Sequence, residues 1–208
     1  GEKQCPKCGY YVDSPQISPY LPLRTLVGGK YIIGKAVSIN SEGISYMAFD
    51  VDKKMPVVFR EFFPEKIASR KHDKKAVMVG ETLQDTYFSL LNDFLDMWRN
   101  IARIRGFSAL IPVLDIIEEN NTAYVVTEYI ESLSLREFLL RSKTGYLNWE
   151  KAKQLFMPVL SLLSNLHNIG IIHYGISPDT LLIGRDGKLR LSGFCIPQIR
   201  FENNGLTP

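Results

Sequence analysis

The apolar pattern of this chain changes its period several times, and the order of those changes constrains the fold. Apolar, aromatic and β-branched residues are concentrated at 31–33, 44–49 and 57–62, which predicts three strands. Two further strand patterns occupy 111–117 and 123–129. Between the two groups, apolar residues recur at spacings of three and four, which is one face of an α-helix. They are Phe88, Leu91, Phe94, Leu95, Trp98, Ile101 and Ile104. The pattern predicts an antiparallel meander with one helix inserted.

A second helix is predicted over residues 149–168. Asn148 is suited to cap its N-terminus, and Glu150 lies in the first turn, where the helix dipole favours an anion. The apolar face of this helix consists of Leu155, Phe156, Val159, Leu160, Leu162, Leu163 and Leu166. A short hairpin follows, with strands at 181–183 and 189–191. We therefore expect an α+β protein whose first half is built on a sheet.

Composition and charge narrow the function classes. The 208 residues are 45% hydrophobic and 23% charged, as in ordinary globular proteins, and the formal net charge is +3. This density of basic residues is too low for a nucleic-acid interface. The longest apolar stretch, 155–172, is interrupted by polar residues, so no membrane span is expected. The start of the chain has no apolar signal region and cysteines are few, so we expect a cytoplasmic location.

Two of the three cysteines, Cys5 and Cys8, form a Cys-x-x-Cys turn near the start of the chain. This spacing directs two thiolates toward one zinc ion, but a structural zinc site needs four ligands. His72 and Cys195 are further candidates that are distant in sequence. Two interpretations stay open, a metal-free turn and a partial or intermolecular zinc site. Residues 1–22, which end in a linker rich in Pro and Ser, are expected to form a separate small element.

The order of the remaining segments resembles that of bacterial eukaryotic-type Ser/Thr protein kinases. Residues 31–50 resemble the first two strands and their Gly-rich turn. Residues 57–64, with the sequence VVFREFFP, resemble the strand that carries the phosphate-binding lysine. Residues 123–129 resemble the strand that leads into the hinge. Residues 171–180 resemble the catalytic loop, and 189–195 resemble the strand that enters the Asp-Phe-Gly motif.

The resemblance implies a protein-kinase-like fold in two parts. Residues 23–130 would form the N-lobe, a five-stranded antiparallel sheet with one helix, together with the hinge. Residues 131–208 would form an incomplete helical C-lobe that ends in the activation segment. Four residues match the family's regulatory spine, an apolar stack that joins the lobes: Ile101, Val113, His173 and Phe194. His173 is expected to be a packed, hydrogen-bonded core residue and not a catalytic one.

The positions that bind phosphates in the family carry other residues here. A phosphate loop needs glycines because backbone N–H groups must approach the phosphates. The matching positions are Ser38, Asn40 and Gly43, so only the last glycine is kept. Glu42 brings a negative charge close to where phosphates would lie. Arg60 stands at the lysine position and keeps the charge, but as a planar fork in place of a compact ammonium.

The positions that carry the chemistry are also altered. Met97 stands where the family has the glutamate that pairs with the lysine, and it cannot pair with Arg60. Gly175 replaces the catalytic aspartate, Thr180 the metal-binding asparagine and Gly193 the aspartate of Asp-Phe-Gly. Glycine offers no carboxylate to Mg²⁺, which prefers oxygen ligands. Phosphoryl transfer depends on positioning and charge neutralisation, so we expect neither ordinary catalysis nor Mg–ATP binding.

The resemblance also implies a vestigial nucleotide cleft. Its residues are expected to be Ser38, Asn40, Gly43, Val58, Arg60, Thr127, Glu128 and Leu182. Val58 adds bulk where the family has an alanine against the adenine ring, and Ser45 stands near the usual apolar roof. A smaller or different ligand is left open.

The resemblance therefore implies a pseudokinase, a catalytically inactive domain that serves as an interaction or regulatory module. One alternative is a divergent Ser/Thr kinase or nucleotide-binding transferase with weak ATP binding and a rearranged site. Another is a structural remnant that docks through Cys5 and Cys8. In the family, later helices of the large lobe cover the helix at 149–168. We expect its apolar face to be partly exposed here, which predicts a protein partner or a homodimer, unless the chain is a truncated fragment.

Overall fold

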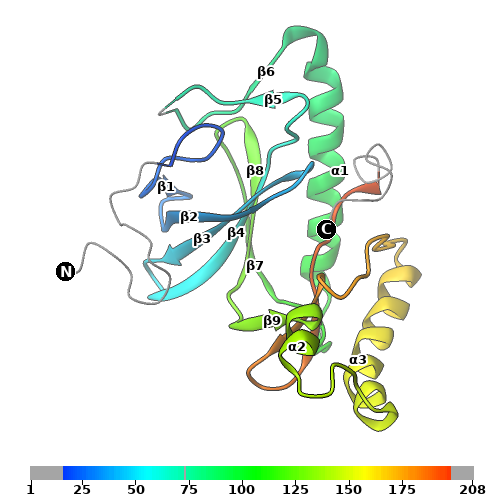
Figure 1. Ribbon diagram of the computed structural model, residues 1–208. Coiled ribbons are helices and arrows are strands. Elements are labelled where there is room, and N and C mark those ends of the chain that lie inside the picture. The colour runs from blue at the N-terminus through cyan, green and yellow to red at the C-terminus, as the bar shows by residue number, and fades with distance from the viewer. Residues whose placement is uncertain (1–15, 73, 198–208) are drawn as a thin grey trace, which may run out of the picture.

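The computed structural model describes residues 16–72 and 74–197 (Figure 1). Its main feature is a six-stranded antiparallel sheet with the strand order β1-β2-β3-β4-β8-β7. The strands are β1 (Leu26–Val27), β2 (Tyr31–Ile39), β3 (Gly43–Asp50), β4 (Met55–Phe62), β7 (Val113–Glu119) and β8 (Thr122–Glu128). The five-stranded antiparallel sheet expected from the sequence is confirmed, and the two-residue strand β1 is added at its edge.

Strand β4 shows why these segments form a sheet with one buried face. Val57 and Phe59 are fully buried, and Val58 between them is half-buried, because successive side chains of a strand point to opposite faces. The same alternation turns Glu61 into the core and Arg60 away from it. The rings of Tyr31, Phe59 and Tyr124 come from three different strands, with centroid distances of 5.6 Å and 5.1 Å. This aromatic cluster joins the strands on the buried face.

The predicted first helix is α1 (Gln84–Arg103), which a short 3₁₀ turn, η1 (Glu81–Leu83), precedes. Its buried residues are Tyr87, Leu91, Phe94, Leu95, Trp98 and Ile101. Phe62 at the end of β4 contacts both Tyr87 and Phe94, at centroid distances of 5.5 Å and 5.1 Å. Phe88, which the periodicity placed on the apolar face, is 44% exposed. The helix is thus fixed to the sheet through aromatic contacts along one stripe.

The second part of the chain contains a small sheet and two helices. The strands are β9 (Ser132–Ser134), β10 (Leu181–Gly184) and β11 (Leu189–Leu191), in the order β11-β10-β9. The helices are α2 (Leu135–Arg141) and α3 (Trp149–Asn168). Asn148 caps α3 as predicted, because its side chain accepts a hydrogen bond from Lys151 N at 2.9 Å. None of the helices within residues 16–72 and 74–197 combines the length and the hydrophobicity that a membrane span requires.

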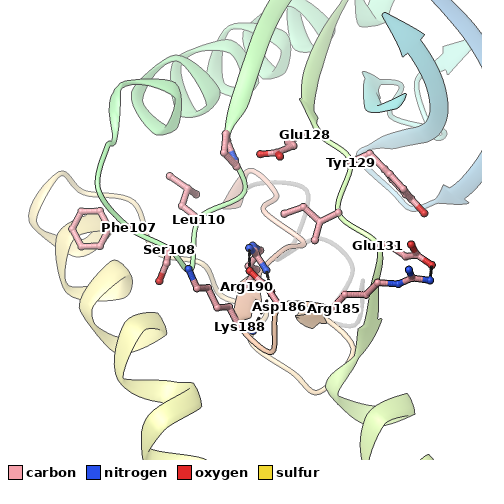
Figure 2. Close-up of a pocket in the computed structure, with 12 residues that line it drawn as sticks. Phe107, Ser108, Leu110, Glu128, Tyr129, Glu131, Arg185, Asp186, Lys188 and Arg190 are labelled. Carbon is pink, nitrogen blue, oxygen red and sulfur yellow. Dashed lines mark hydrogen bonds and ion pairs between the residues drawn. The ribbon is translucent and has the colours of Figure 1, made fainter. Parts of the chain in front are cut away.

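One ion pair joins the β10–β11 hairpin to the segment that follows β8, and a second lies within the hairpin (Figure 2). Arg185 pairs with Glu131 at 2.5 Å. Arg190 donates from both terminal nitrogens to Asp186, at 2.9 Å and 2.7 Å, and this lowers the pKa of the Asp186 carboxyl. The four residues border a cavity of about 420 Å³. Each of these four charges therefore has an opposite partner at the rim of the cavity.

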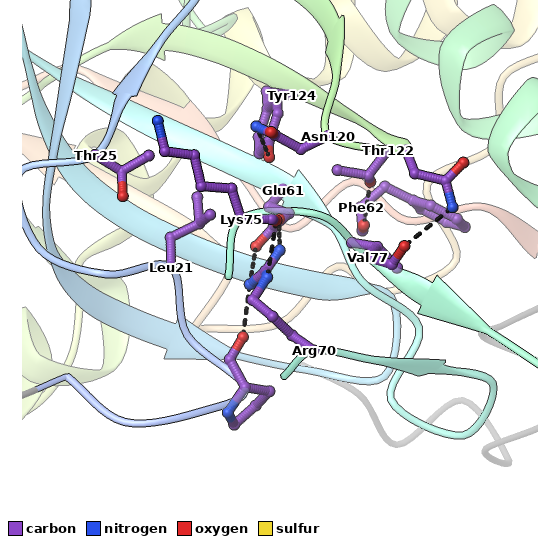
Figure 3. A network of polar contacts seen from close by, with 12 residues as sticks. Leu21, Thr25, Glu61, Phe62, Arg70, Lys75, Val77, Asn120, Thr122 and Tyr124 are labelled. Carbon is purple, nitrogen blue, oxygen red and sulfur yellow. Dashed lines mark hydrogen bonds and ion pairs between the residues drawn. The ribbon is translucent and has the colours of Figure 1, made fainter. Parts of the chain in front are cut away.

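A buried ion pair joins β4 to the loop before α1 (Figure 3). The Arg70 guanidinium pairs with the Glu61 carboxylate, and the two side chains are 1% and 0% exposed. Tyr46 also donates to Glu61, at 2.9 Å. Arg70 reaches two backbone carbonyls as well, Pro19 at 2.6 Å and Lys75 at 3.0 Å. Burial raises the pKa of Glu61, and the Arg70 charge opposes that shift.

The segment before β1 lies against the sheet. The Gln16 amide oxygen accepts from Ala36 N at 2.9 Å, and its amide nitrogen donates to Leu21 O at 2.8 Å. Leu21 is fully buried and donates its N–H to Tyr46. Residues 16–21, which the sequence assigned to the element at 1–22, therefore pack on the N-lobe. Cys5 and Cys8 lie outside the described residues, so the zinc site stays a prediction.

Candidate functional site

A cavity of about 440 Å³ lies between the main sheet and the β10–β11 hairpin. Seven of the residues predicted for the cleft line it: Ser38, Asn40, Val58, Arg60, Thr127, Glu128 and Leu182. Its upper and lower walls are mostly apolar, with Val37, Ile39, Val58, Leu110 and Leu182. Polar side chains gather at the end nearest the β2–β3 turn, where Asn40, Ser45 and Arg60 meet. The cavity therefore has an apolar slot and a polar end.

Arg60 occupies the polar end and is held by neighbours from the β2–β3 region. Its Nη2 donates to Asn40 Oδ1 at 2.7 Å and to Glu42 Oε2 at 2.8 Å. Its Nη1 donates to Ser45 Oγ at 3.3 Å. The Arg60 side chain is only 13% exposed. The guanidinium thus has an acidic partner inside the protein, and that partner comes from the turn and not from helix α1.

The sequence did not reveal the partners of Glu42, which lies at the polar end of the site. It is fully buried, and its second oxygen, Oε1, accepts a hydrogen bond from Ile196 N at 2.8 Å. The sequence predicted a negative charge near the phosphate position. It did not predict a carboxylate that bridges β4 and the segment after Phe194, because Ile196 lies 154 positions away. No local pattern reports such a contact.

Gly43, the one glycine kept in the loop, is explained by packing. A Cβ at this position would lie 1.9 Å from the Glu61 carbonyl oxygen, closer than any side chain can approach. Gly43 pairs with Phe62 across the β3–β4 ladder, and it is not among the residues that line the cavity. Its retention therefore follows from the close approach of two strands, and it is no evidence for phosphate binding.

Trp98 is the α1 residue that reaches the cavity. Its ring contacts that of Phe194 at 5.8 Å, and Phe194 contacts His173 at 4.8 Å. Met97, predicted at the glutamate position, is half-buried and packs against the hydrophobic core. Ile101 is fully buried in that core. Consecutive side chains on a helix point about 100° apart. Placing the family's glutamate position one residue further along α1 would therefore select Trp98 in place of Met97.

The catalytic-type loop is closed on itself by hydrogen bonds. His173 is 2% exposed; its Nε2 lies 2.7 Å from Ser192 O, and its Nδ1 accepts from Gly175 N at 3.3 Å. A carbonyl accepts and an N–H donates, so the ring is neutral with its proton on Nε2. The packed, hydrogen-bonded role expected for His173 is confirmed. Gly175 contributes backbone groups alone to this loop.

The two predicted metal-ligand positions, Thr180 and Gly193, lie against each other. A Cβ on Gly193 would lie 2.7 Å from Thr180 Cγ2, and the backbone there has a φ of +78°. Thr180 Oγ1 donates to Gly175 O at 2.9 Å, so its hydroxyl proton is engaged inside the loop. The Thr180 methyl thus fills the space that a side chain at 193 would need. This arrangement does not fit a bound Mg²⁺ ion, which needs carboxylate oxygens here.

Two acidic side chains, Glu128 and Asp179, line the cavity, and Asp179 is committed to a surface ion pair. Both of its oxygens accept from Arg136, at 2.7 Å and 2.9 Å, which lowers the pKa of the Asp179 carboxyl. Within residues 16–72 and 74–197, no group of three or more His, Cys, Asp or Glu side chains could hold a metal ion. The described residues therefore provide an apolar slot, an internally paired arginine and no metal centre.

Comparison with known proteins identifies the family. The family model described as protein kinase domain matches residues 65–201, which is more than half of the chain. Sperm motility kinase 2B of Mus musculus is 33% identical over 85 residues, covering 41% of this chain and 17% of that protein. Serine/threonine-protein kinase PrkC of Bacillus subtilis (strain 168) is 28% identical over 108 residues, covering 50% of this chain and 16% of that protein. The chain spans about a sixth of the length of these relatives.

Solved structures agree with the sequence comparison. The apo form of PpkA-294 superposes with a TM-score of 0.76 at 25% identity, covering 90% of this chain and 66% of that one. Rad53 (residues 1–466, in complex with AMP-PNP) superposes with a TM-score of 0.60 at 13% identity, covering 81% and 39%, and shows the fold alone. With its antiparallel sheet, inserted helix and cleft, this chain belongs to the protein kinase domain family.

Proposed function

We propose that this protein is a catalytically inactive kinase-like domain that acts as an interaction or regulatory module. The observation that carries the proposal is the contact between Thr180 and Gly193. Where the chemistry needs two metal ligands, a methyl group lies 2.7 Å from the place of a Cβ. An aspartate introduced at 193 alone would clash with the Thr180 methyl group. The site therefore differs from a metal-binding one at two packed positions, not at one.

Two further features support the proposal. Gly175 offers no side chain to accept a proton from a substrate hydroxyl, which is the role of an aspartate in phosphoryl transfer by kinases. Arg60, at the lysine position, is paired with Glu42 at 2.8 Å and so is not available to a nucleotide without breaking that pair. The positions of the base and of the metal ligands thus lack the required side chains, and the phosphate-binding cation is already paired. The apolar slot of the cavity is still present.

The alternative, a divergent kinase with weak ATP binding, rests on the retained cavity and on the positive charge of Arg60. The two functions differ in a measurable way. We expect the melting temperature with saturating ATP to be the same in EDTA, Mg²⁺ and Mn²⁺, and we expect no phosphate transfer to the protein itself or to a generic Ser/Thr substrate. A nucleotide bound with metal at 100 times its Kd would add about 2.7 kcal/mol of stability.

An active Ser/Thr kinase assayed in parallel serves as the positive control. A metal-dependent rise in the melting temperature, or incorporation of labelled γ-phosphate above the heat-denatured protein, would favour the divergent kinase and end the proposal.

An interaction module needs an exposed surface, and helix α3 offers one. Most of the apolar face that the sequence predicted to be partly exposed is buried, namely Leu155, Val159, Leu162, Leu163 and Leu166, whereas Met157 and Leu160 are 55% and 54% exposed. Between Lys153 and Asn168 the helix contains no Lys, Arg, Asp or Glu. Two copies of this chain could therefore bring these faces together without burying an unpaired charge, which would be costly. The proposed partner for this face is a second copy of the chain.

Sedimentation velocity tests this self-association. We expect a reversible dimer at high protein concentration and a monomer for Leu160→Glu, because the new carboxylate would be desolvated in the interface. Leu140→Glu is a matched control, since Leu140 is 79% exposed on helix α2. A monomeric wild-type protein, or equal effects of the two substitutions, would rule out an interface at α3.

A further inference from the structure

The polar end of the cleft is filled by a carboxylate of the protein itself. Glu42 is fully buried and lies 2.8 Å from Arg60 Nη2. Asn40 and Ser45 accept from the same guanidinium, at 2.7 Å and 3.3 Å. The one basic side chain at this end of the lining is therefore surrounded by acceptors from its own chain. An anion that approached Arg60 would meet an existing anion.

A phosphorylated ligand has two ways to enter, and both are unfavourable. If Glu42 stays in place, the phosphate lies beside a buried carboxylate, and repulsion is strong where water is excluded. If Glu42 moves away, it breaks its bond to Arg60 and its 2.8 Å bond from Ile196 N. A buried N–H that loses its partner is itself costly. By either route, a phosphorylated ligand binds the cleft more weakly than the same ligand without its phosphates.

The other end of the cleft has the half-buried Glu128 at its edge, but its described residues include no fully buried carboxylate paired with a lining cation. Its walls are apolar, with Val37, Ile39 and Val58 on one side and Leu110 and Leu182 on the other. Its edge follows the chain from Thr127 to Ile130. A volume of about 440 Å³ is within the range of pockets that hold small organic ligands. An apolar slot with a polar edge suits a flat, uncharged ring system.

We propose that this cleft selects uncharged planar heteroaromatic ligands, such as a nucleoside, over their phosphorylated forms, and that Glu42 is the specificity-determining residue. The inference rests on the proposed function, since a domain that does not transfer phosphate has no need to admit it. The Glu42 carboxylate takes the place beside Arg60 that a ligand phosphate would otherwise occupy.

Isothermal titration of the whole chain in EDTA tests the proposal, with adenosine, AMP and ATP as probes. These ligands share base and ribose, so differences among them report the phosphates. We expect the wild type to bind adenosine about tenfold or more tightly than ATP, because the ATP phosphates would be repelled by the Glu42 carboxylate. In Glu42→Gln we expect the ATP affinity to rise about tenfold or more, while adenosine affinity changes little.

Glu65→Gln is the matched control, because Glu65 is an exposed carboxylate outside the cleft. The control should keep the wild-type order of affinities, and the circular dichroism of all variants should match. Absence of adenosine binding, equal wild-type affinities for adenosine and ATP, or an unchanged ratio in folded Glu42→Gln would each overturn the inference. If Glu42→Gln fails to fold, the wild-type ratio still tests whether the cleft prefers the uncharged ligand. These outcomes are independent of phosphate transfer and of metal-dependent stabilisation by ATP, either of which would overturn the proposed function.

Discussion

Replacing Arg70 with alanine is expected to lower the free energy of unfolding by about 3–5 kcal/mol, the usual cost of removing one partner of a buried ion pair. The Glu61 carboxylate is fully buried and would keep only neutral donors such as Tyr46. The carbonyls of Pro19 and Lys75 would also lose their donor. Urea denaturation of wild type and variant measures the loss directly.

The loss in Arg70→Ala should also depend on pH. Burial already raises the pKa of Glu61 above its ordinary value of 4.5, and removing the Arg70 charge raises it further. Above pH 4.5 the unfolded chain then releases a proton that the folded chain retains, so stability falls as the pH rises. The variant should therefore be closest to the wild type in acid and furthest from it near neutrality.

Arg185→Ala is the matched control for this experiment. Arg185 also pairs with a glutamate, Glu131, but the two side chains are 77% and 54% exposed. Exposed ion pairs contribute little, so we expect almost no change in the free energy of unfolding. If Arg70→Ala behaved like Arg185→Ala, the buried pair would not be the anchor of the N-lobe that the structure indicates.

Gly43→Ala is expected to destabilise the protein by about 3 kcal/mol or more, at the upper end of the cost of overpacking. The added Cβ would lie 1.9 Å from the Glu61 carbonyl oxygen and 3.1 Å from Phe63 N, and both are backbone atoms that cannot rotate away. Strands β3 and β4 would have to separate at their Gly43–Phe62 pair. Urea denaturation again gives the measurement.

Gly80→Ala separates this clash from the general effect of removing a glycine. Gly80 has an extended backbone with a φ of −62°, and no atom lies within 4 Å of its Cβ position. Alanine there should leave stability unchanged or raise it by about 0.4–1 kcal/mol, because the unfolded chain loses freedom. A small effect of Gly43→Ala would mean that its retention has another cause, such as a ligand that approaches the backbone.

Much of the fold could be predicted from the sequence because the spacing of apolar residues within a strand or helix follows from the geometry of that element alone. The alternation in 57–62 and the three- and four-residue spacing in α1 depend only on strand and helix geometry. The Asn148 cap is likewise a contact over three residues. Helix α2 was missed, since seven residues are too few for a clear period. Its one signal was the capping box formed by Ser134 and Glu137.

The candidate site could be predicted only in part. The resemblance to kinases pointed to the cleft residues, and seven of them line one cavity. It did not point to Trp98, because a shift of one residue on a helix turns the side chain by about 100°. The bridge from Arg60 through Glu42 to Ile196 joins three distant segments, and each residue alone has an ordinary identity.

Residue identities alone were enough to show that positions 175 and 193 carry no carboxylate, because glycine has no side chain in any conformation. What fills their places depends on packing between segments far apart in the chain. The Thr180 methyl lies where a side chain at 193 would begin, and the Glu42 carboxylate lies on Arg60. Such contacts are set by how β3, β4 and the catalytic-type loop come together in space, and their long separation along the chain leaves no periodic trace in the sequence.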